Sequence, residues 1–390
     1  MNTAASLPMS ESHNPTLVRG EIPTAGLADG IVEVSEAVII RVVAAENWPG
    51  HKPEPDGTIL PGLIDIHCHG GGGHTLCTTD TGEALAAARH HREAGTTGVV
   101  ASLVTAPAAT LLDQVRALAP LVADGQLLGI HLEGPFLSEK RRGAQDPDWL
   151  LEPDPALAER FIEAGGGAIK VMTIAPELRR AADVISVLRQ AGVTVALGHT
   201  DASYDTMRRA IDALDGTALV THVANGMAPL HHRAAGPVGA ALVAAAAGEA
   251  TVELIDDGVH VDRGFSSLVF AAAAPGRVAL ITDAMAAAGM SDGEYQLGPQ
   301  RVRVAAGVAR LADGEAIAGG TSHLLEDVTR AGGTAAAIEA ASATPARVLG
   351  LSAGQGTLTP GAPADLLVTT AGRVAKIMLN GRWSGGREGR

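Results

Sequence analysis

The chain has few cysteines, few aromatic residues and no excess of positive charge. Cys68 and Cys77 are its two cysteines, too few for a disulfide framework, and a chain of 390 residues is long enough not to need one. Aromatic residues make up 2%, so Ala, Val, Leu and Gly must fill the core. The net charge of -14 argues against a nucleic-acid partner, because a phosphate backbone requires a basic face. A small anionic substrate stays compatible with this charge, since it needs only a local positive pocket.

Long apolar runs are also absent from the sequence. The longest run, "PVGAALVAAAAG", falls well short of the ~20 residues that a membrane helix needs. The first sixteen residues are polar and contain no apolar core like that of a signal peptide. We therefore expect a cytoplasmic protein without membrane contact, with a disordered tail over residues 1–16.

From residue 59 onward the sequence repeats one pattern, in which a short aliphatic run ends in a polar residue and a helical segment follows. The eight runs are "ILPGLIDIH", "TGVVASLVT", "LLGIHLEG", "AIKVMTIAP", "VTVALGHT", "ALVTHVAN", "TVELIDDGVH" and "RVALITDA". The segments between them carry helix signals, such as a polar N-cap and terminal Gly in "TDTGEALAAARHHREAG" and Pro176 near the first turn of "APELRRAADVISVLRQAG". Apolar strands alternating with helices indicate a parallel sheet buried on both faces. Eight such units over roughly 230 residues predict a (β/α)8 TIM-like barrel in the α/β class.

The two ends of the chain show a different pattern. Residues 17–58 contain strand-like pieces such as "GIVEVSEAVIIRVV" without a helical period, and the C-terminal stretch contains a hairpin signal at "NGR". We expect residues 17–58 and 356–390 to form one small β domain beside a catalytic barrel of residues 59–355.

Polar residues stand at the ends of most of the predicted barrel strands. In barrels of this type the carboxyl ends of the strands form the active site. The residues at these ends are His67 and His69 in the first run, His131 and Glu133 in the third, His199 in the fifth, His222 in the sixth, Asp257 and His260 in the seventh, and Asp283 in the eighth.

These strand ends predict a metal centre. A single histidine at a strand end is more often a packing residue, Asp283 could cap a helix, and Glu133 could serve a turn. Histidine at five of eight strand ends, with acids at matching depth, is difficult to explain as a set of independent accidents. The set suits zinc or another divalent ion bound by imidazole and carboxylate. Asp283 would then take and return a proton, which predicts metal-assisted hydrolysis.

Several longer motifs resemble the amidohydrolase superfamily and, within it, the N-acetylglucosamine-6-phosphate deacetylases. The resemblance covers nearly the whole chain and includes "PGLIDIHCHGGGG", "HLEGPF", "GHTDA", "THVANGM", "IDDGVHVD" and "ITDAM". It implies hydrolysis of the acetamide of N-acetylglucosamine 6-phosphate to glucosamine 6-phosphate and acetate, in amino-sugar catabolism and cell-wall recycling. It also implies a homodimer.

The resemblance implies roles for the metal-ligating residues. Glu133, His199 and His222 match the ligands of the main metal ion. His67 and His69, with Asp283 and a bridging Glu133, would form a second site. Some relatives lack this histidine pair and use one metal, so one or two ions per subunit are expected. Zinc is the first choice, with iron, manganese and cobalt as alternatives, and Asp283 matches the catalytic acid and base.

The resemblance further implies a substrate pocket. Asn225 and Gly226 would bind the phosphate, together with Arg233 of a neighbouring subunit, whose guanidinium suits a phosphate. The other residues expected to contact substrate are Ala144, Gln145, Asp257, His260, Ile317, Ala318 and Gly319. Gln145 stands where many family members have His, and His323 stands where a small uncharged residue is expected.

Two alternatives stay open. One is another amidohydrolase, acting on a cyclic amide with a carbamylated Lys170 as the metal bridge, or on a different N-acetylated amino sugar. The other is a sugar-phosphate binding protein without activity, for which the retention of Asp283 would be unexpected.

Overall fold

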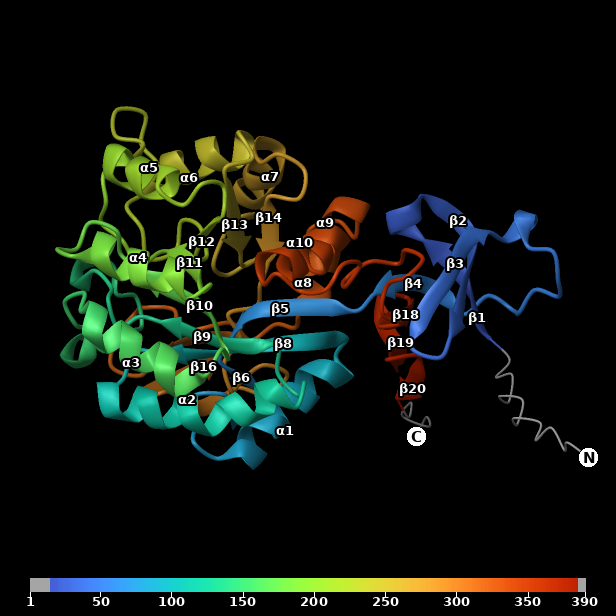
Figure 1. The fold of residues 1–390 in the computed structure, drawn as a ribbon, viewed down its shortest axis with the longest axis horizontal. Helices are drawn as coiled ribbons and strands as arrows, with labels where there is room; N and C mark the ends of the chain where they lie inside the picture. Colours follow the sequence, from blue (N-terminus) through green and yellow to red (C-terminus); the bar gives the residue numbers. More distant parts are fainter. Residues whose placement is uncertain (1–14, 385–390) are drawn as a thin grey trace, which may run out of the picture.

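The computed structural model describes residues 15–384. All but the last two residues of the expected N-terminal tail lie outside this range. Within it the chain forms a barrel of parallel strands covered by helices and a separate sheet built from both chain ends (Figure 1).

The eight predicted parallel strands form one sheet, which confirms the (β/α)8 barrel. Its order is β5, β8, β9, β10, β11, β12, β13, β14, and an isolated parallel bridge from Cys68 to Ala284 joins the two edges. The strands are β5 (Leu63–Cys68), β8 (Thr96–Val104), β9 (Gly129–Glu133), β10 (Ile169–Ile174), β11 (Thr194–Leu197), β12 (Ala218–Val220), β13 (Ala250–Leu254) and β14 (Val278–Leu280).

Helices follow the barrel strands and pack around them. They are α1 (Thr81–Glu93), α2 (Ala108–Ala123), α3 (Pro155–Gly165), α4 (Ala181–Gln190), α5 (Tyr204–Asp212), α6 (Gly236–Ala246) and α7 (Arg263–Ala272), with α8 (Leu324–Arg330), α9 (Ala335–Ala340) and α10 (Ala343–Val348) after the last strand. Side chains such as Ile66, Val100 and Val171 fill the barrel interior, and a larger apolar cluster joins strands to helices. The core is aliphatic, as the low aromatic content predicts.

The second sheet has seven strands in the order β20, β19, β18, β4, β1, β2, β3. They are β1 (Thr16–Ile22), β2 (Leu27–Ser35), β3 (Val38–Ala44), β4 (Gly57–Pro61), β18 (Leu366–Thr370), β19 (Arg373–Leu379) and β20 (Arg382–Ser384), with short 3-10 turns η1 (Pro23–Ala25) and η2 (Ala45–Asn47). The predicted small β domain from both chain ends is therefore confirmed. Residues 59–61, expected to begin the barrel, instead pair with β18 in this sheet.

The sequence also predicted a hairpin at "NGR" and a helix start near Pro176. The "NGR" hairpin is confirmed, since Leu379 pairs with Arg382 around Asn380 and Gly381, which both have positive φ. Helix α4 begins at Ala181, beyond Pro176, which lies in a turn before it.

A three-stranded antiparallel sheet follows β14 and had not been expected. It consists of β15 (Gly293–Leu297), β16 (Gln300–Ala305) and β17 (Val308–Leu311). Smaller elements near the site are the hairpin of β6 (Gly70–Gly71) and β7 (His74–Thr75) and the 3-10 turns η3 (Glu139–Arg141) and η4 (Pro147–Trp149). Among residues 15–384, no helix is both long and apolar enough to cross a bilayer.

Candidate active site

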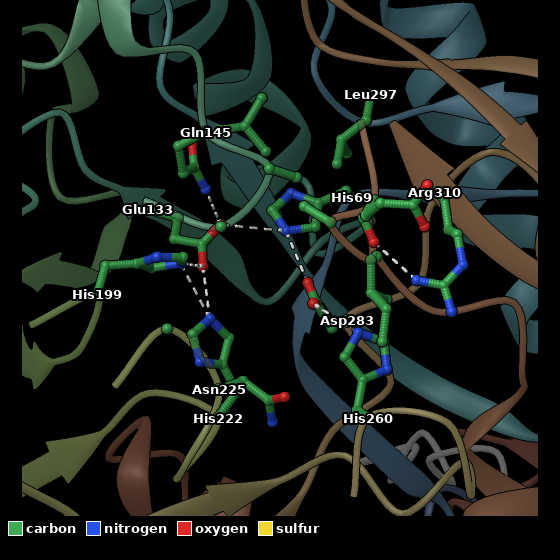
Figure 2. Close-up of a pocket in the computed structure, with 18 residues that line it drawn as sticks. His69, Glu133, Gln145, His199, His222, Asn225, His260, Asp283, Leu297 and Arg310 are labelled. Atoms are coloured by element: carbon green, nitrogen blue, oxygen red, sulfur yellow. Dashed lines mark hydrogen bonds and ion pairs between the residues drawn. The ribbon is translucent and has the colours of Figure 1, made fainter. Parts of the chain in front are cut away.

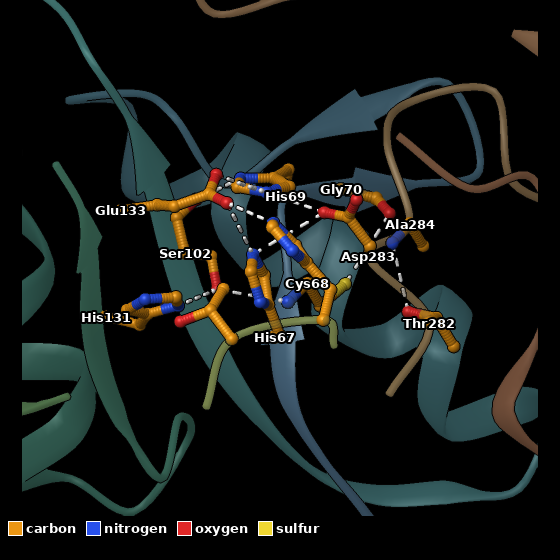
Figure 3. Close-up of polar contacts among 12 residues, drawn as sticks. His67, Cys68, His69, Gly70, Ser102, His131, Glu133, Thr282, Asp283 and Ala284 are labelled. Atoms are coloured by element: carbon orange, nitrogen blue, oxygen red, sulfur yellow. Dashed lines mark hydrogen bonds and ion pairs between the residues drawn. The ribbon is translucent and has the colours of Figure 1, made fainter. Parts of the chain in front are cut away.

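Glu133, the last residue of β9, lies at the centre of a cluster of four histidines at the carboxyl ends of the barrel strands (Figure 2, Figure 3). Its Oε1 is 2.9 Å from Nε2 of His199 and 2.9 Å from Nε2 of His222. Nε2 of His69 lies 3.4 Å from its Oε2, and Nε2 of His67 lies 3.5 Å from its Oε1. All five side chains are buried. They form two three-residue groups with metal-ligand spacing that share Glu133.

Hydrogen bonds at Nδ1 orient the imidazole rings. Nδ1 of His69 donates to the Ser102 carbonyl oxygen at 2.9 Å, and Nδ1 of His199 donates to the Arg141 carbonyl oxygen at 2.8 Å. A carbonyl oxygen only accepts, so the proton belongs on Nδ1 and the Nε2 lone pair faces Glu133. This is the arrangement in which a histidine binds a metal ion.

His67 supplies the clearest sign that a cation fits the cluster. Its Nδ1 donates to Glu253 at 3.1 Å, while its buried Nε2 has no hydrogen-bond partner among residues 15–384. That Nε2 faces carboxylate oxygens of Glu133 and Asp283, both at 3.5 Å. Burial opposes a charge on the ring, yet Glu133 and Glu253 outweigh it and raise the pKa of His67. The two carboxylates thus favour positive charge at Nε2, and a divalent cation bound there would supply it.

Asp283 lies beside the cluster, just after β14. Its Oδ1 is 3.0 Å from Nε2 of His69, and its backbone N–H donates to the His67 carbonyl oxygen at 2.9 Å. Burial opposes ionisation, but the contact with His69 and the charge of His67 lower the pKa of Asp283. An ionised carboxylate at this place can accept a proton.

His260 extends the site beyond Asp283. Its Nε2 lies 3.9 Å from Oδ2 of Asp283, and its Nδ1 donates to Oδ2 of Asp257 at 2.8 Å. Burial opposes protonation of His260, yet the hydrogen bond to Asp257 raises its pKa. Asp257 therefore holds the ring in place from behind.

A cavity of about 350 Å³ opens onto this cluster (Figure 2). The residues expected to contact substrate that line it are Ala144, Gln145, Asn225, Gly226, His260, Ile317 and Gly319. Three expected residues lie outside its wall. Asp257 supports His260, Ala318 is fully buried, and Arg233 lies in an exposed loop after β12.

Gln145 contacts the Glu133 carboxylate. Its amide nitrogen donates to Oε2 of Glu133 at 2.6 Å, and its amide oxygen accepts the Thr105 backbone N–H at 2.8 Å. Gln145 thus lies at both the cluster and the cavity wall.

Sequence reasoning missed the part of the wall that comes from the β15–β17 sheet and the loop after it. Leu297, Arg310 and Glu315 line the cavity from this segment. Arg310 donates through Nη1 to the Glu315 carbonyl oxygen at 2.7 Å, and it is the one Lys or Arg among the described residues of the wall. The segment "EYQLGPQRVRVAAGVARL" has strand-like runs separated by turn residues, a pattern that could have indicated this sheet.

Sequence reasoning also missed Ser102 and Glu253, which contact histidines of the cluster. Glu253 had a signal, since it is an acidic residue inside the apolar run "TVELI". His131 was noted at its strand end without a role. It is fully buried, with its ring against that of His67 at 4.5 Å and its Nδ1 3.0 Å from the Ser102 hydroxyl (Figure 3).

Two residues with open roles lie outside the cavity wall. Lys170 is near the start of β10, three residues before Thr173, which pairs with Glu133, so it lies roughly 10 Å along the strand from the bridging position. His323 precedes α8, where its backbone N–H donates to Glu326 at 3.1 Å and its Nε2 lies 2.9 Å from Nε2 of His90.

A closed barrel of parallel strands, with imidazole and carboxylate groups converging at its carboxyl ends, defines the class of metal-dependent barrel hydrolases. Residues 58–384 match the sequence model of the amidohydrolase family. The chain belongs to this family.

Curated relatives and solved structures narrow the placement. The chain is 35% identical over 329 residues to N-acetylglucosamine-6-phosphate deacetylase of Bacillus subtilis, covering 81% of each chain. It is 35% identical over 366 residues to N-acetylgalactosamine-6-phosphate deacetylase of Escherichia coli O157:H7, covering 91% of this chain and 93% of that protein.

One similar solved structure is a mutant N-acetyl-D-glucosamine-6-phosphate deacetylase of Mycobacterium smegmatis in complex with N-acetyl-D-glucosamine-6-phosphate. It has a TM-score of 0.89 and 39% identity, over 95% of this chain and 99% of that one. The chain is an enzyme of this deacetylase group.

Proposed function

We propose that the protein hydrolyses the acetamide of N-acetylglucosamine 6-phosphate to glucosamine 6-phosphate and acetate, a step of amino-sugar catabolism and cell-wall recycling. One observation carries the proposal: histidine Nε2 atoms and Asp283 converge on Glu133 at the floor of a cavity lined by Asn225 and Gly226. The relatives' names supply the substrate.

The residues fit two divalent ions. Glu133, His199 and His222 would hold the main ion, and His67, His69 and Asp283 would hold the second with Glu133 as the bridge. Zinc suits these ligands, and iron, manganese or cobalt would also be accepted. An ion bound there supplies Lewis acidity, which polarises an amide carbonyl and promotes loss of a proton from water.

Asp283 performs the proton transfers of the reaction. As an ionised carboxylate it accepts a proton from the attacking water, whose oxygen bonds to the acetyl carbon. Asp283 then returns the proton to the nitrogen as the C–N bond breaks, so the amine leaves together with acetic acid, which loses its proton to the amine or to solvent and becomes acetate. His260, held by Asp257, borders the same space and orients the sugar.

The phosphate lies at the Asn225 side of the cavity. Asn225 and the Gly226 backbone bind it, and Arg233 from the neighbouring copy of a homodimer completes the site. In support, Arg233 lies in an exposed loop that follows the same strand as Asn225. A cavity of about 350 Å³ is in the range that accepts a small ligand.

N-acetylgalactosamine 6-phosphate is a second candidate substrate. The Escherichia coli relative named for this sugar is as similar as the Bacillus subtilis one. Gln145, in the cavity wall, departs from the family pattern and can alter the contact with a sugar hydroxyl. A cyclic-amide hydrolase with a Lys170 bridge is not favoured, because Lys170 lies far from Glu133 along its strand.

Acetate release by the metal-replete protein tests the proposal. The substrates are N-acetylglucosamine 6-phosphate, N-acetylgalactosamine 6-phosphate and unphosphorylated N-acetylglucosamine. We expect turnover of the first to exceed turnover of the unphosphorylated sugar by at least ~100-fold in kcat/KM, since two or more charge-assisted hydrogen bonds to the phosphate are lost. If N-acetylgalactosamine 6-phosphate is turned over faster, it is the substrate in place of N-acetylglucosamine 6-phosphate. If none of the three sugars releases acetate, the proposal is overturned.

A further inference from the structure

Glu253 is a fully buried carboxylate for which the proposed reaction gives no role. It lies in the interior of β13, between Val252 and Leu254, and has no exposed surface. Burying a carboxylate is costly unless hydrogen bonds or a positive charge compensate it. An acid at this point of an apolar strand therefore needs partners that offset the unfavourable free energy of its burial.

One oxygen of Glu253 contacts ligands of both proposed ions. Its Oε2 accepts a hydrogen bond from Nδ1 of His67 at 3.1 Å and another from the backbone N–H of His222 at 3.2 Å. Oε1 has no hydrogen-bond partner among residues 15–384. Both hydrogen bonds of the carboxylate among the described residues therefore come from these two histidines.

The contact with His67 decides which way that ring presents its nitrogens. The Glu253 oxygen accepts this hydrogen bond, so Nδ1 carries a proton and Nε2 is the nitrogen left to face a metal ion. That Nε2 points at Glu133 and Asp283, and among the described residues nothing else bonds to it. Turning the ring over, or moving the proton to Nε2, would remove the bond to Glu253.

We propose that Glu253 is the positioning residue of the second metal site, holding the His67 ring through Nδ1 so that Nε2 is presented to the ion. This inference rests on the two-ion site of the proposed function. A carboxylate behind a ligand histidine fixes its orientation and increases its basicity, and removing such a partner costs 10- to 100-fold in metal affinity as a rule.

The two ions should differ in their dependence on Glu253. His222 is also held through its neighbour Val223, whose backbone N–H donates to the Glu253 carbonyl oxygen at 2.8 Å. That bond survives a change of side chain. His199 is oriented by the Arg141 carbonyl, independently of Glu253. His67 has no such second support at Nδ1 among the described residues, so the ion at His67 should weaken first.

Metal binding to the full chain tests this directly. Protein stripped with a chelator is titrated with Zn²⁺ by calorimetry, and bound zinc is counted by mass spectrometry of the desalted protein. The variants are Glu253→Leu, which removes the acceptor, and Glu253→Gln, which keeps an acceptor oxygen at the same chain length. Asp256→Asn is the matched control, since Asp256 follows the same strand, is buried, and accepts from the Ser266 hydroxyl at 2.9 Å.

We expect two ions in wild type and in Asp256→Asn, with one of them bound roughly 10- to 100-fold more weakly in Glu253→Leu and the other little changed. Glu253→Gln should recover much of the lost affinity. The proposal is overturned if Glu253→Leu binds both ions as tightly as wild type. It is also overturned if Glu253→Leu binds neither ion and its thermal stability falls further than that of Asp256→Asn. A third contrary result is a zinc affinity of Glu253→Gln as low as that of Glu253→Leu. A wild type with one ion would overturn it too, while acetate release would still report independently on the proposed reaction.

Discussion

Oε1 of Glu133 lies 2.9 Å from Nε2 of His199, although 66 residues separate them in the chain. Both side chains are buried, and the His199 ring receives its orientation from the Arg141 carbonyl on its far side. A carboxylate and an imidazole lone pair at this distance attract each other only through a shared proton or cation.

Replacing Asp283 by Asn should remove the proton acceptor and donor of the reaction. We expect kcat for acetate release to fall by roughly 10²- to 10⁴-fold, the usual contribution of general acid and base catalysis. The variant should keep its fold, because Asn can retain the size of the side chain and the backbone bond to His67. A variant with kcat within a few-fold of wild type, at equal zinc content, would show that Asp283 is not the proton carrier.

Removing the metal should lower the stability of the barrel. A ligand present at 100 times its Kd stabilises the folded state by about 2.7 kcal/mol, so chelation should lower Tm by several degrees. Differential scanning calorimetry with and without chelator measures the shift. In His199→Gln we expect a smaller shift, because one ligand of the main site is lost, and an equal shift would place the main ion elsewhere.

Arg310 should contribute to substrate binding from within the same chain. Among the Lys and Arg residues of the described chain, it is the one that lines the cavity. Arg310→Met keeps much of the length and removes the charge, and we expect KM to rise about 10-fold, corresponding to one charge-assisted hydrogen bond, with a smaller change in kcat. Unchanged KM for the phosphorylated sugars would show that the guanidinium does not contact them.

If Arg233 acts in the neighbouring site, two inactive variants should complement each other. Arg233→Ala and Asp283→Asn each impair their own homodimers, but a mixed dimer contains one site with its own Asp283 and its partner's intact arginine. Equal mixing after subunit exchange should restore roughly a quarter of the wild-type activity, since half of the dimers are mixed and each has one complete site. No recovery in mixtures shown to contain mixed dimers would refute the shared site.

Asp327 should make stability depend on pH. This carboxyl on α8 is 1% exposed, and neither oxygen has a hydrogen-bond partner among residues 15–384. Burial raises its pKa well above the ordinary value. A raised folded pKa means that the folded state keeps the proton after the unfolded chain has lost it. Its contribution to stability is therefore intact below pH ~4, the unfolded value, and decreases as pH rises toward the folded value.

Asp327→Asn should remove this dependence. The quantity to compare is the unfolding free energy of the variant minus that of wild type. We expect this difference to be larger at pH 8 than at pH 4, by on the order of 1 kcal/mol or more. Urea unfolding at both pH values measures it. If the variant and wild type change in parallel, Asp327 is not the group responsible.

The barrel was predictable because its signals are local. Each strand is a short aliphatic run, and a helix follows each of them, in the case of β14 after an intervening three-stranded sheet, so eight repeats define the architecture. The start of the barrel was misplaced at residue 59 because "ILPGLIDIH" reads as one strand, while the structure ends β4 at Pro61 and begins β5 at Leu63. Gly62 marks the break, and the chain passes there from one sheet to the other.

Residue types and their spacing were enough to indicate the chemistry, because histidines and acids stand at the ends of predicted parallel strands, on a chain whose composition allows an aliphatic barrel. Strand ends meet around one axis by geometry, so their residues could be grouped before any contact was known. Which atoms face one another is seen in the folded chain alone. Glu253 behind His67, Gln145 on Glu133 and Arg310 in the cavity wall depend on strand register and loop path, which sequence periodicity does not encode.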